Sequence, residues 1–254
     1  MPAGASNLLR GDLWNTGVIV TTSRGVGNVR PMAEYVLASF LLFARGLHCA
    51  FRDRQHHRFD HGAYRPVAID GKTVCVVGAG GIGREVARLG AGAGMRVIGT
   101  KRSATPSDRL PEGFSRLSGP EHLMQFLMEA DFVAVCCQWT PETTGLIGRQ
   151  ALAAMKPGAT LVNVARGEII DEEALVAALN EGKLRGVALD VYVGEFERPP
   201  DVRLWDHERA IITPHVSAAS DLSRHRGIEL FCRNLGAYLE GQPLLNMVDW
   251  VRGY

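Results

Sequence analysis

A glycine-rich turn between a short apolar strand and a helix constrains this chain more than any other feature. Residues 73–77 (TVCVV) are apolar and mostly β-branched, which predicts a buried strand, and a helix is predicted over residues 85–93. Gly78, Gly80 and Gly83 lie between them in the spacing GxGxxG. In this context the first glycine permits a tight turn, the second lets a pyrophosphate approach the backbone, and the third lets the helix lie close to the strand. The turn therefore predicts a dinucleotide site, with a glycine-rich turn that binds no ligand as the alternative.

The rest of the chain alternates strands with helices. Further strands are predicted at residues 96–100, 132–137, 161–165, 186–191 and 210–213, and helices at 121–129, 148–155 and from Asp171 to Gly182. Because the strands are almost continuously apolar, both faces of their sheet must be buried. The pattern predicts an α/β fold with a Rossmann-type doubly wound parallel sheet. A long helix (31–50), a polar loop (52–66) and a C-terminal helix (221–239) are predicted outside this core.

Composition excludes several classes of partner. The chain has 28 basic and 27 acidic residues and 7% aromatic residues, so we expect no nucleic-acid partner. Its five cysteines include no CxxC pair, which is unlike a disulfide framework or a zinc site, and we expect no metal. The apolar stretch 35–44 is about half as long as a bilayer requires, and no secretory signal is visible. We expect a cytoplasmic protein with no membrane partner.

The end of the second predicted strand bears on the choice of cofactor. An NAD site usually has an acidic residue there, which binds the ribose 2′-hydroxyl. Here Thr100, Lys101, Arg102 and Ser103 follow the strand, and no acid occurs before Asp108. Two cations and hydroxyl groups suit a 2′-phosphate, so we expect NADP to be preferred over NAD. A solvated basic loop is the alternative.

Five segments resemble one enzyme family. GKTVCVVGAGGIGREVA, TPETTGLIG, MKPGATLVNVARGEIIDEEALVAAL, GVALDVY and ITPHVSAAS are similar to motifs of the D-isomer-specific 2-hydroxyacid dehydrogenases, which include glyoxylate, hydroxypyruvate and phosphoglycerate enzymes. The resemblance extends from about residue 3 to residue 254. It implies a nicotinamide-dependent oxidoreductase acting on a small 2-oxoacid or 2-hydroxyacid.

The resemblance also implies a catalytic triad of Arg166, Glu195 and His215. His215 has the pKa range needed to protonate a carbonyl oxygen, and Glu195 would orient its imidazole and raise its pKa. Arg166 would bind the substrate carboxylate and polarise the 2-oxo group. Taken singly, His215 could cap a turn, Glu195 could be a solvated loop acid, and Arg166 could form a surface ion pair.

Further contacts with the cofactor are implied by the same resemblance. Gly81 and Ile82 are expected under the pyrophosphate, Cys137 beside the nicotinamide ribose, and four residues near the nicotinamide: Val164, Ala165, Asp190 and Ser217. Beside Cys137, Gln138 and Trp139 replace the proline and leucine usual in the family, which alters that wall of the site.

The family's flavodoxin-like substrate domain is largely absent from the sequence. We expect residues 1–29 to be a remnant of it, residues 30–220 to form the NAD(P)-binding Rossmann domain, and residues 221–254 to return to the substrate domain. An N-terminally truncated gene product is favoured over a genuine short form, because the remnant would expose apolar residues such as 18–20. The family's dimer arm corresponds to helix 31–50, which predicts a homodimer; burial of this helix within its own subunit is the alternative.

These observations predict a reductase of glyoxylate or hydroxypyruvate type that uses NADPH or NADH. An NAD-linked phosphoglycerate-type dehydrogenase is one alternative, and a dinucleotide-sensing protein without catalysis is another.

Overall fold

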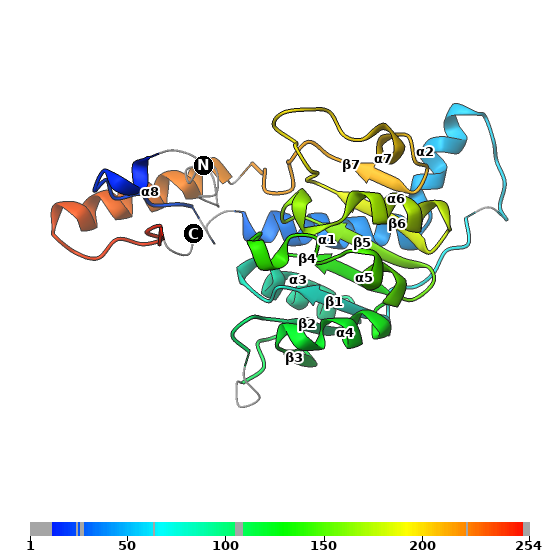
Figure 1. Cartoon of the computed structure of the whole chain (residues 1–254), viewed down its shortest axis with the longest axis horizontal. Helices are drawn as coiled ribbons and strands as arrows, with labels where there is room; N and C mark the ends of the chain where they lie inside the picture. The colour runs from blue at the N-terminus through cyan, green and yellow to red at the C-terminus, as the bar shows by residue number, and fades with distance from the viewer. Residues whose placement is uncertain are drawn as a thin grey trace. The chain divides into compact units, whose positions relative to one another are not determined.

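The chain forms two compact units in a computed structural model that describes residues 12–23, 25, 28–62, 64–104, 109–221 and 223–250. The larger unit is Ala33–Ser217, and the smaller one comprises the described residues of Met1–Met32 and Ala218–Tyr254 (Figure 1). The helices are α1 (Val29–Ala44), α2 (Leu47–Gln55), α3 (Gly81–Gly92), α4 (Leu123–Glu129), α5 (Arg149–Ala154), α6 (Glu172–Asn180), α7 (Val202–Trp205) and α8 (Ser223–Leu239). Short 3₁₀-helices are η2 (Leu13–Asn15), η3 (Pro120–His122), η4 (Pro141–Thr143) and η5 (Gly167–Ile169).

A parallel sheet forms the centre of the larger unit. Its strands, as far as the chain is described, are β1 (Thr73–Val77), β2 (Arg96–Thr100), β3 (Arg116–Ser118), β4 (Phe132–Val135), β5 (Ala159–Asn163), β6 (Leu184–Leu189) and β7 (Ala210–Ile212). They lie in the order β3-β2-β1-β4-β5-β6-β7, and every neighbouring pair is parallel. The doubly wound α/β fold predicted from the sequence is confirmed. The prediction missed β3, a short edge strand.

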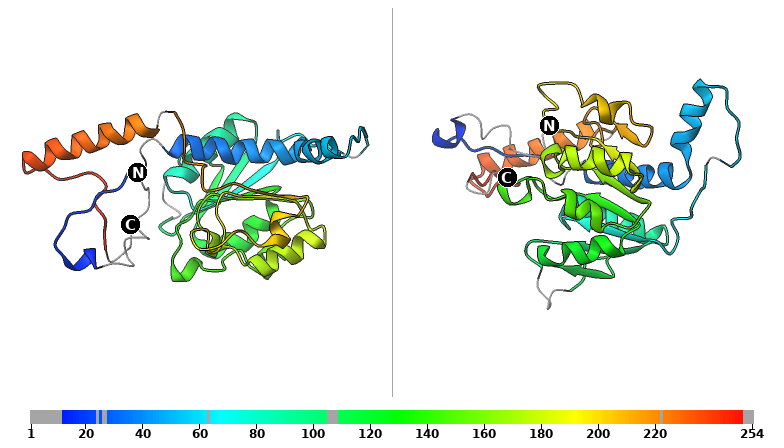
Figure 2. Two further views of the ribbon diagram at one scale, coloured as in Figure 1. Left: turned by 90° about the horizontal axis from the view of Figure 1, so that it is seen from above. Right: turned by 45° about the vertical axis from the view of Figure 1, so that its right-hand side comes forward.

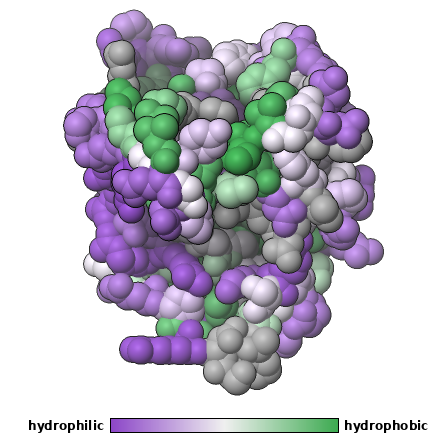
Figure 3. All heavy atoms as spheres, turned by 90° about the vertical axis from the view of Figure 1, so that its left-hand side faces the viewer, coloured by the Kyte–Doolittle hydropathy of each residue, from purple (hydrophilic) through white to green (hydrophobic). Residues whose placement is uncertain are grey.

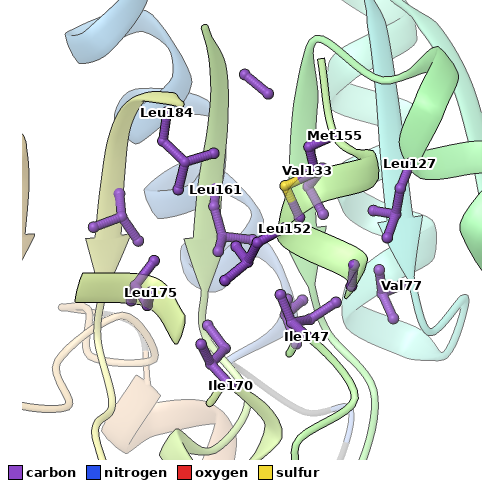
Figure 4. Packing of buried hydrophobic residues seen from close by; sticks show 14 of the residues in the cluster. Val77, Leu127, Val133, Ile147, Leu152, Met155, Leu161, Ile170, Leu175 and Leu184 are labelled. Atoms are coloured by element: carbon purple, nitrogen blue, oxygen red, sulfur yellow. The ribbon is translucent and has the colours of Figure 1, made fainter. Parts of the chain in front are cut away.

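Helices cover both faces of this sheet (Figure 2). On one face, α4, α5 and α6 enclose a core that includes Leu127, Leu152, Leu161 and Leu175 (Figure 4). On the other face, the rings of Phe40 in α1 and Phe132 in β4 lie 4.9 Å apart between centroids. Because alternate residues of each strand are buried on opposite faces, the continuous apolar runs are explained.

The predicted single helix over residues 31–50 is wrong. The chain breaks between α1 and α2 at Gly46, which adopts φ +71° in the left-handed region, and the two helices are bent by 65°. A Cβ at Gly46 would lie 2.9 Å from the backbone oxygen of Tyr64, so glycine is needed there. The predicted loop 52–66 also begins inside α2. Within the described residues no single helix could cross a bilayer, and only this bent pair has the combined length and apolarity.

The smaller unit has an exposed apolar groove. Its C-terminal helix, predicted at 221–239, is present as α8. Two backbone bonds, Thr22 N to Asn246 O (3.0 Å) and Val248 N to Val20 O (2.9 Å), connect the two ends of the chain. A groove of about 440 Å³ is lined by Val18, Ile19, Phe231, Leu235, Tyr238 and four other residues. Figure 3 shows apolar side chains exposed among polar ones on the face that it draws.

Candidate active site

The residues predicted for the site follow the carboxyl ends of six parallel strands. Those ends lie at one edge of the sheet, and β1 and β4 are neighbours at the point where the strand order reverses. In open parallel α/β sheets a ligand binds outside the strands at this point. The topology therefore brings the glycine turn, the loop after β5 and the loop after β7 to one edge.

The glycine turn after β1 has the shape that a pyrophosphate requires. Gly78 adopts φ +98°, and a Cβ on it would lie 2.5 Å from the Cα of Cys137. A Cβ on Gly83 would overlap the backbone oxygen of Gly78. A Cβ on Gly80, in contrast, would meet no heavy atom of the described residues within 4 Å, so their contacts do not explain this glycine. The open space lies at the N-terminus of α3, which no side chain caps and which favours an anion.

The amides of Gly81, Ile82 and Gly83 form the first turn of α3. First-turn amides lack intrahelical partners, so they are available to a bound anion. The glycine turn and these amides together fit a dinucleotide.

The basic segment after β2 lies beside this turn. The backbone oxygen of Thr100 accepts hydrogen bonds from the amides of Gly78 (3.1 Å) and Ala79 (2.8 Å). Lys101 is half-buried, whereas Arg102 and Ser103 are exposed. The pKa of the Glu142 carboxyl is lowered, mainly by its hydrogen bond with Thr140 and in part by the charge of Arg102. Arg102 is therefore close enough to the η4 segment to act on it, while Asp108 lies outside the described residues.

The loop after β5 is fixed by a buried asparagine. The Asn163 side chain donates to the oxygen of Arg166 (2.8 Å) and accepts from the amide of Ala165 (2.9 Å). Val164 and Ala165 are buried, and the Arg166 guanidinium donates to the oxygen of Ala165 (2.6 Å). A Cβ on Gly167 would overlap the backbone of Tyr192, so this loop lies directly against the loop after β6. Asn163 is not among the site residues predicted from the sequence.

His215 and Glu195 form a hydrogen-bonded pair. His215 Nδ1 lies 3.0 Å from Glu195 Oε1, and only 10% of the Glu195 side chain is exposed. The hydrogen bond to Glu195 raises the pKa of His215; partial burial and the charge of Arg166 oppose this shift. The positive charge of Arg166 thus acts on His215, although His215 is bonded directly only to Glu195 within this predicted triad. A histidine in this arrangement can hold a proton for transfer to an oxyanion.

Asp190 and Ser217 are buried beside the backbone of the loop that contains His215. Asp190 is 1% exposed, and its carboxylate accepts from the amides of Val216 (2.8 Å) and Ser217 (2.9 Å). Its structural role is therefore to hold the loop after β7. The buried Oγ of Ser217 has no hydrogen-bond partner among the described residues, which fits a polar group of a bound ligand.

The segment after β4 contains Cys137, Gln138 and Trp139, of which the last two differ from the residues usual in the family that the sequence resembles. Burial raises the pKa of Cys137 to about 11, so its thiol stays protonated. Trp139 donates from Nε1 to Thr144 Oγ1 at 2.9 Å, which fixes its ring against η4. Thr143 likewise donates to the oxygen of Gln138 at 2.8 Å.

Known proteins resemble this chain over both sequence and fold. Residues 37–217 match the family model for the D-isomer specific 2-hydroxyacid dehydrogenase NAD-binding domain. A D-3-phosphoglycerate dehydrogenase from Mycobacterium tuberculosis is 35% identical over 219 residues, 84% of this chain and 40% of that protein. A glyoxylate reductase from Thermococcus gammatolerans is 39% identical over 182 residues, 70% of this chain and 52% of that protein. The chain thus spans about half the length of these curated relatives, or less.

A solved structure supports the same grouping. The D-isomer specific 2-hydroxyacid dehydrogenase from Xanthobacter autotrophicus Py2, in complex with NADPH and MES, superposes with a TM-score of 0.83 at 31% identity. The match covers 99% of this chain and 100% of that one. The sequence, the topology and the site geometry therefore agree that this chain belongs to the D-isomer specific 2-hydroxyacid dehydrogenase family and contains its NAD-binding domain.

Proposed function

We propose that this chain binds NADPH in preference to NADH and reduces a small 2-oxoacid, such as glyoxylate or hydroxypyruvate, to the D-2-hydroxyacid. The observation that carries the proposal is the hydrogen bond between His215 and the buried carboxylate of Glu195, at the same sheet edge as the glycine turn. Relatives named glyoxylate reductase support the substrate class, and the NADPH complex of a related structure supports the cofactor.

The protein groups divide the chemistry between them. The bound nicotinamide supplies the hydride that reduces the 2-oxo carbon. His215, protonated at Nε2, gives a proton to the carbonyl oxygen, so that the ketone becomes an alcohol. Glu195 stabilises the protonated imidazole, and Arg166 offers a planar pair of donors to the substrate carboxylate.

The cofactor is held by two neighbouring segments in this proposal. The glycine turn and first-turn amides of α3 bind the pyrophosphate, and Thr100, Lys101, Arg102 and Ser103 surround the 2′-phosphate. Cys137, Val164, Ala165, Asp190 and Ser217 line the nicotinamide side. The exposed space beside Gly80 and the unpartnered Oγ of Ser217 support this placement.

The parts outside the cofactor domain have proposed roles as well. The smaller unit corresponds to part of a substrate domain, as the exposed apolar groove lined by Val18 and Phe231 suggests. A second copy of the chain is proposed to cover α2 and its following loop, where Phe51 is 66% and Phe59 is 90% exposed. Sedimentation equilibrium tests the dimer: a mass of one chain across the concentration range contradicts it.

Turnover measurements test the function directly. Oxidation of NADPH and NADH by the purified chain is followed with glyoxylate or hydroxypyruvate present. His215→Gln is expected to slow reduction by about 10²- to 10⁴-fold, the usual contribution of a positioned acid, without loss of NADPH binding. The control is His225→Gln, because that histidine is exposed on α8 and pairs with Glu229 of the same helix.

Three results would contradict the proposal. Wild-type turnover in the His215→Gln variant would show that His215 is not the proton donor. A folded wild-type chain that binds NADPH tightly but turns over no 2-oxoacid or 2-hydroxyacid would favour a dinucleotide-sensing protein. Faster oxidation of 3-phosphoglycerate with NAD would instead support a phosphoglycerate-type dehydrogenase, the activity named for the mycobacterial relative.

A further inference from the structure

A chain of hydrogen bonds runs from α1 to the loop that carries His215. The Tyr35 hydroxyl lies 2.7 Å from Thr213 Oγ1, and Thr213 Oγ1 donates to Asp190 Oδ1 at 2.6 Å. A threonine hydroxyl has a single proton, which here goes to Asp190, so Tyr35 must be the donor to Thr213. These contacts connect a helix at the start of the larger unit to the far end of its sheet.

Asp190 transmits this connection to the backbone around His215. The carboxylate accepts the amides of Val216 and Ser217, and its backbone oxygen accepts the amide of His215 at 3.0 Å. His215 itself adopts φ +55°, in the left-handed region that a residue with a side chain rarely occupies. Such a conformation persists only where surrounding contacts impose it.

We propose that Tyr35 is a positioning residue for His215. It acts through Thr213 and Asp190, whose bonds hold the strained loop in the one conformation that keeps His215 Nδ1 beside Glu195. Burial raises the pKa of Tyr35, so its hydroxyl remains protonated and available as a donor near neutral pH. The proposal rests on the function proposed above for His215, but its structural part can be tested without turnover.

The charges around His215 make this role separable from direct electrostatics. Glu195 and Asp190 favour the protonated imidazole, Arg166 opposes it, and the Phe196 ring lies 6.0 Å away between centroids. Removing the Tyr35 hydroxyl changes none of these charges. A changed titration of His215 in Tyr35→Phe would therefore report a change in loop geometry.

The experiment compares Tyr35→Phe with Tyr64→Phe, the same substitution at a partly exposed tyrosine of the loop after α2. The imidazole of His215 is titrated by NMR in the full chain, with its signal identified by its loss in His215→Gln. In Tyr35→Phe the pKa of His215 is expected to fall towards the ordinary histidine value. In reduction assays kcat is expected to fall about 3- to 10-fold, the effect of one lost hydrogen bond, with KM changed less than about 2-fold. Tyr64→Phe is expected to change neither the titration nor the kinetics.

Each outcome has a distinct meaning. A wild-type His215 titration in folded Tyr35→Phe overturns the positioning role, whether or not the enzyme turns over. If the pKa of His215 is lowered in Tyr35→Phe and the wild-type chain itself reduces no 2-oxoacid, the positioning role is supported and the proposed function is contradicted. Thr213→Val, which interrupts the same chain with a side chain of similar shape, is expected to lower the pKa of His215 as well. If Tyr35→Phe does not fold, an unchanged titration in Thr213→Val overturns the proposal.

Discussion

Two glycines of the same turn are expected to respond to alanine in opposite ways. Gly80 has φ −79° and ψ −157°, a conformation open to any residue, and its added Cβ would meet no atom within 4 Å in the part of the chain that the structure describes. Gly80→Ala should therefore leave the free energy of unfolding unchanged or raise it by up to about 1 kcal/mol, because the unfolded chain loses conformational freedom.

The affinity of Gly80→Ala for the cofactor is expected to fall strongly. A methyl group in the open space would hold the pyrophosphate away from the amides of α3. Losing two hydrogen bonds to a charged group, at about 1.5 kcal/mol each, costs about 3 kcal/mol, which is roughly a 100-fold increase in Kd. NADPH and NADH should be affected equally, since both carry the pyrophosphate.

Gly83→Ala supplies the contrast. Its Cβ would overlap the oxygen of Gly78 and lie 2.8 Å from Val76 Cγ1, so the helix must move away from β1. We expect a loss of about 1–3 kcal/mol in the free energy of unfolding, the usual cost of overpacking. Calorimetric titration with each cofactor and thermal melts of both variants measure the two effects. Wild-type affinity in Gly80→Ala would refute the assignment of the turn to the pyrophosphate, and equal destabilisation of both variants would refute the packing argument.

Three further variants test the remaining chemistry and packing. Glu195→Gln removes the group that raises the pKa of His215, so the decline in kcat/KM for reduction with rising pH should begin at lower pH. About a third of the His215 side chain is exposed to solvent, which weakens its interaction with Glu195. The lost hydrogen bond is therefore expected to be worth about 1.5 kcal/mol, the lower limit for a bond to a charged group, which corresponds to roughly a tenfold loss of kcat/KM at pH values above the His215 pKa of both proteins. A pH profile that matches wild type would contradict this expectation. The double variant Lys101→Ala, Arg102→Ala should raise the Kd for NADPH about tenfold, measured by fluorescence titration, and leave NADH unaffected; an equal loss for both cofactors would count against a phosphate site. Leu161→Ala, at a fully buried position, should lower the free energy of unfolding by about 2–5 kcal/mol in urea titrations, and a loss below about 1 kcal/mol would refute the central packing.

The sequence pattern predicts the strands better than the helices. The bounds of β1 and β2 agree with the prediction, because short β-branched runs between turn residues have one reading in a buried parallel sheet. Strand β3 has only the residues Arg116–Ser118, all partly exposed, so it leaves no apolar run to detect. The break at Gly46 is hard to see in the sequence because apolar residues lie on both sides of Arg45 and Gly46, and because the contact that requires glycine comes from Tyr64.

The residues of the candidate site also differ in how far the sequence predicts them. Residues within local motifs, such as Gly78 and His215, are visible in the sequence because their spacing reflects local geometry. Asn163 could have been noticed as an amide ending a buried strand, where its side chain bonds to nearby backbone. Tyr35 could not, because its partner Thr213 is 178 residues away and only the folded sheet brings them together.

The left-handed backbone of His215 places conformational strain at the residue proposed to transfer the proton. Glycine or asparagine would occupy φ +55° at lower cost, and the difference is about 1 kcal/mol in favour of the folded chain. The loss of the hydrogen bond to Glu195 opposes this gain, so a laboratory selection for heat resistance alone would discard the imidazole where Glu195 is replaced as well. Any library that randomises residues 195 and 215 together needs a screen for turnover alongside the one for melting temperature, because members that lose both side chains also lose the proposed proton donor.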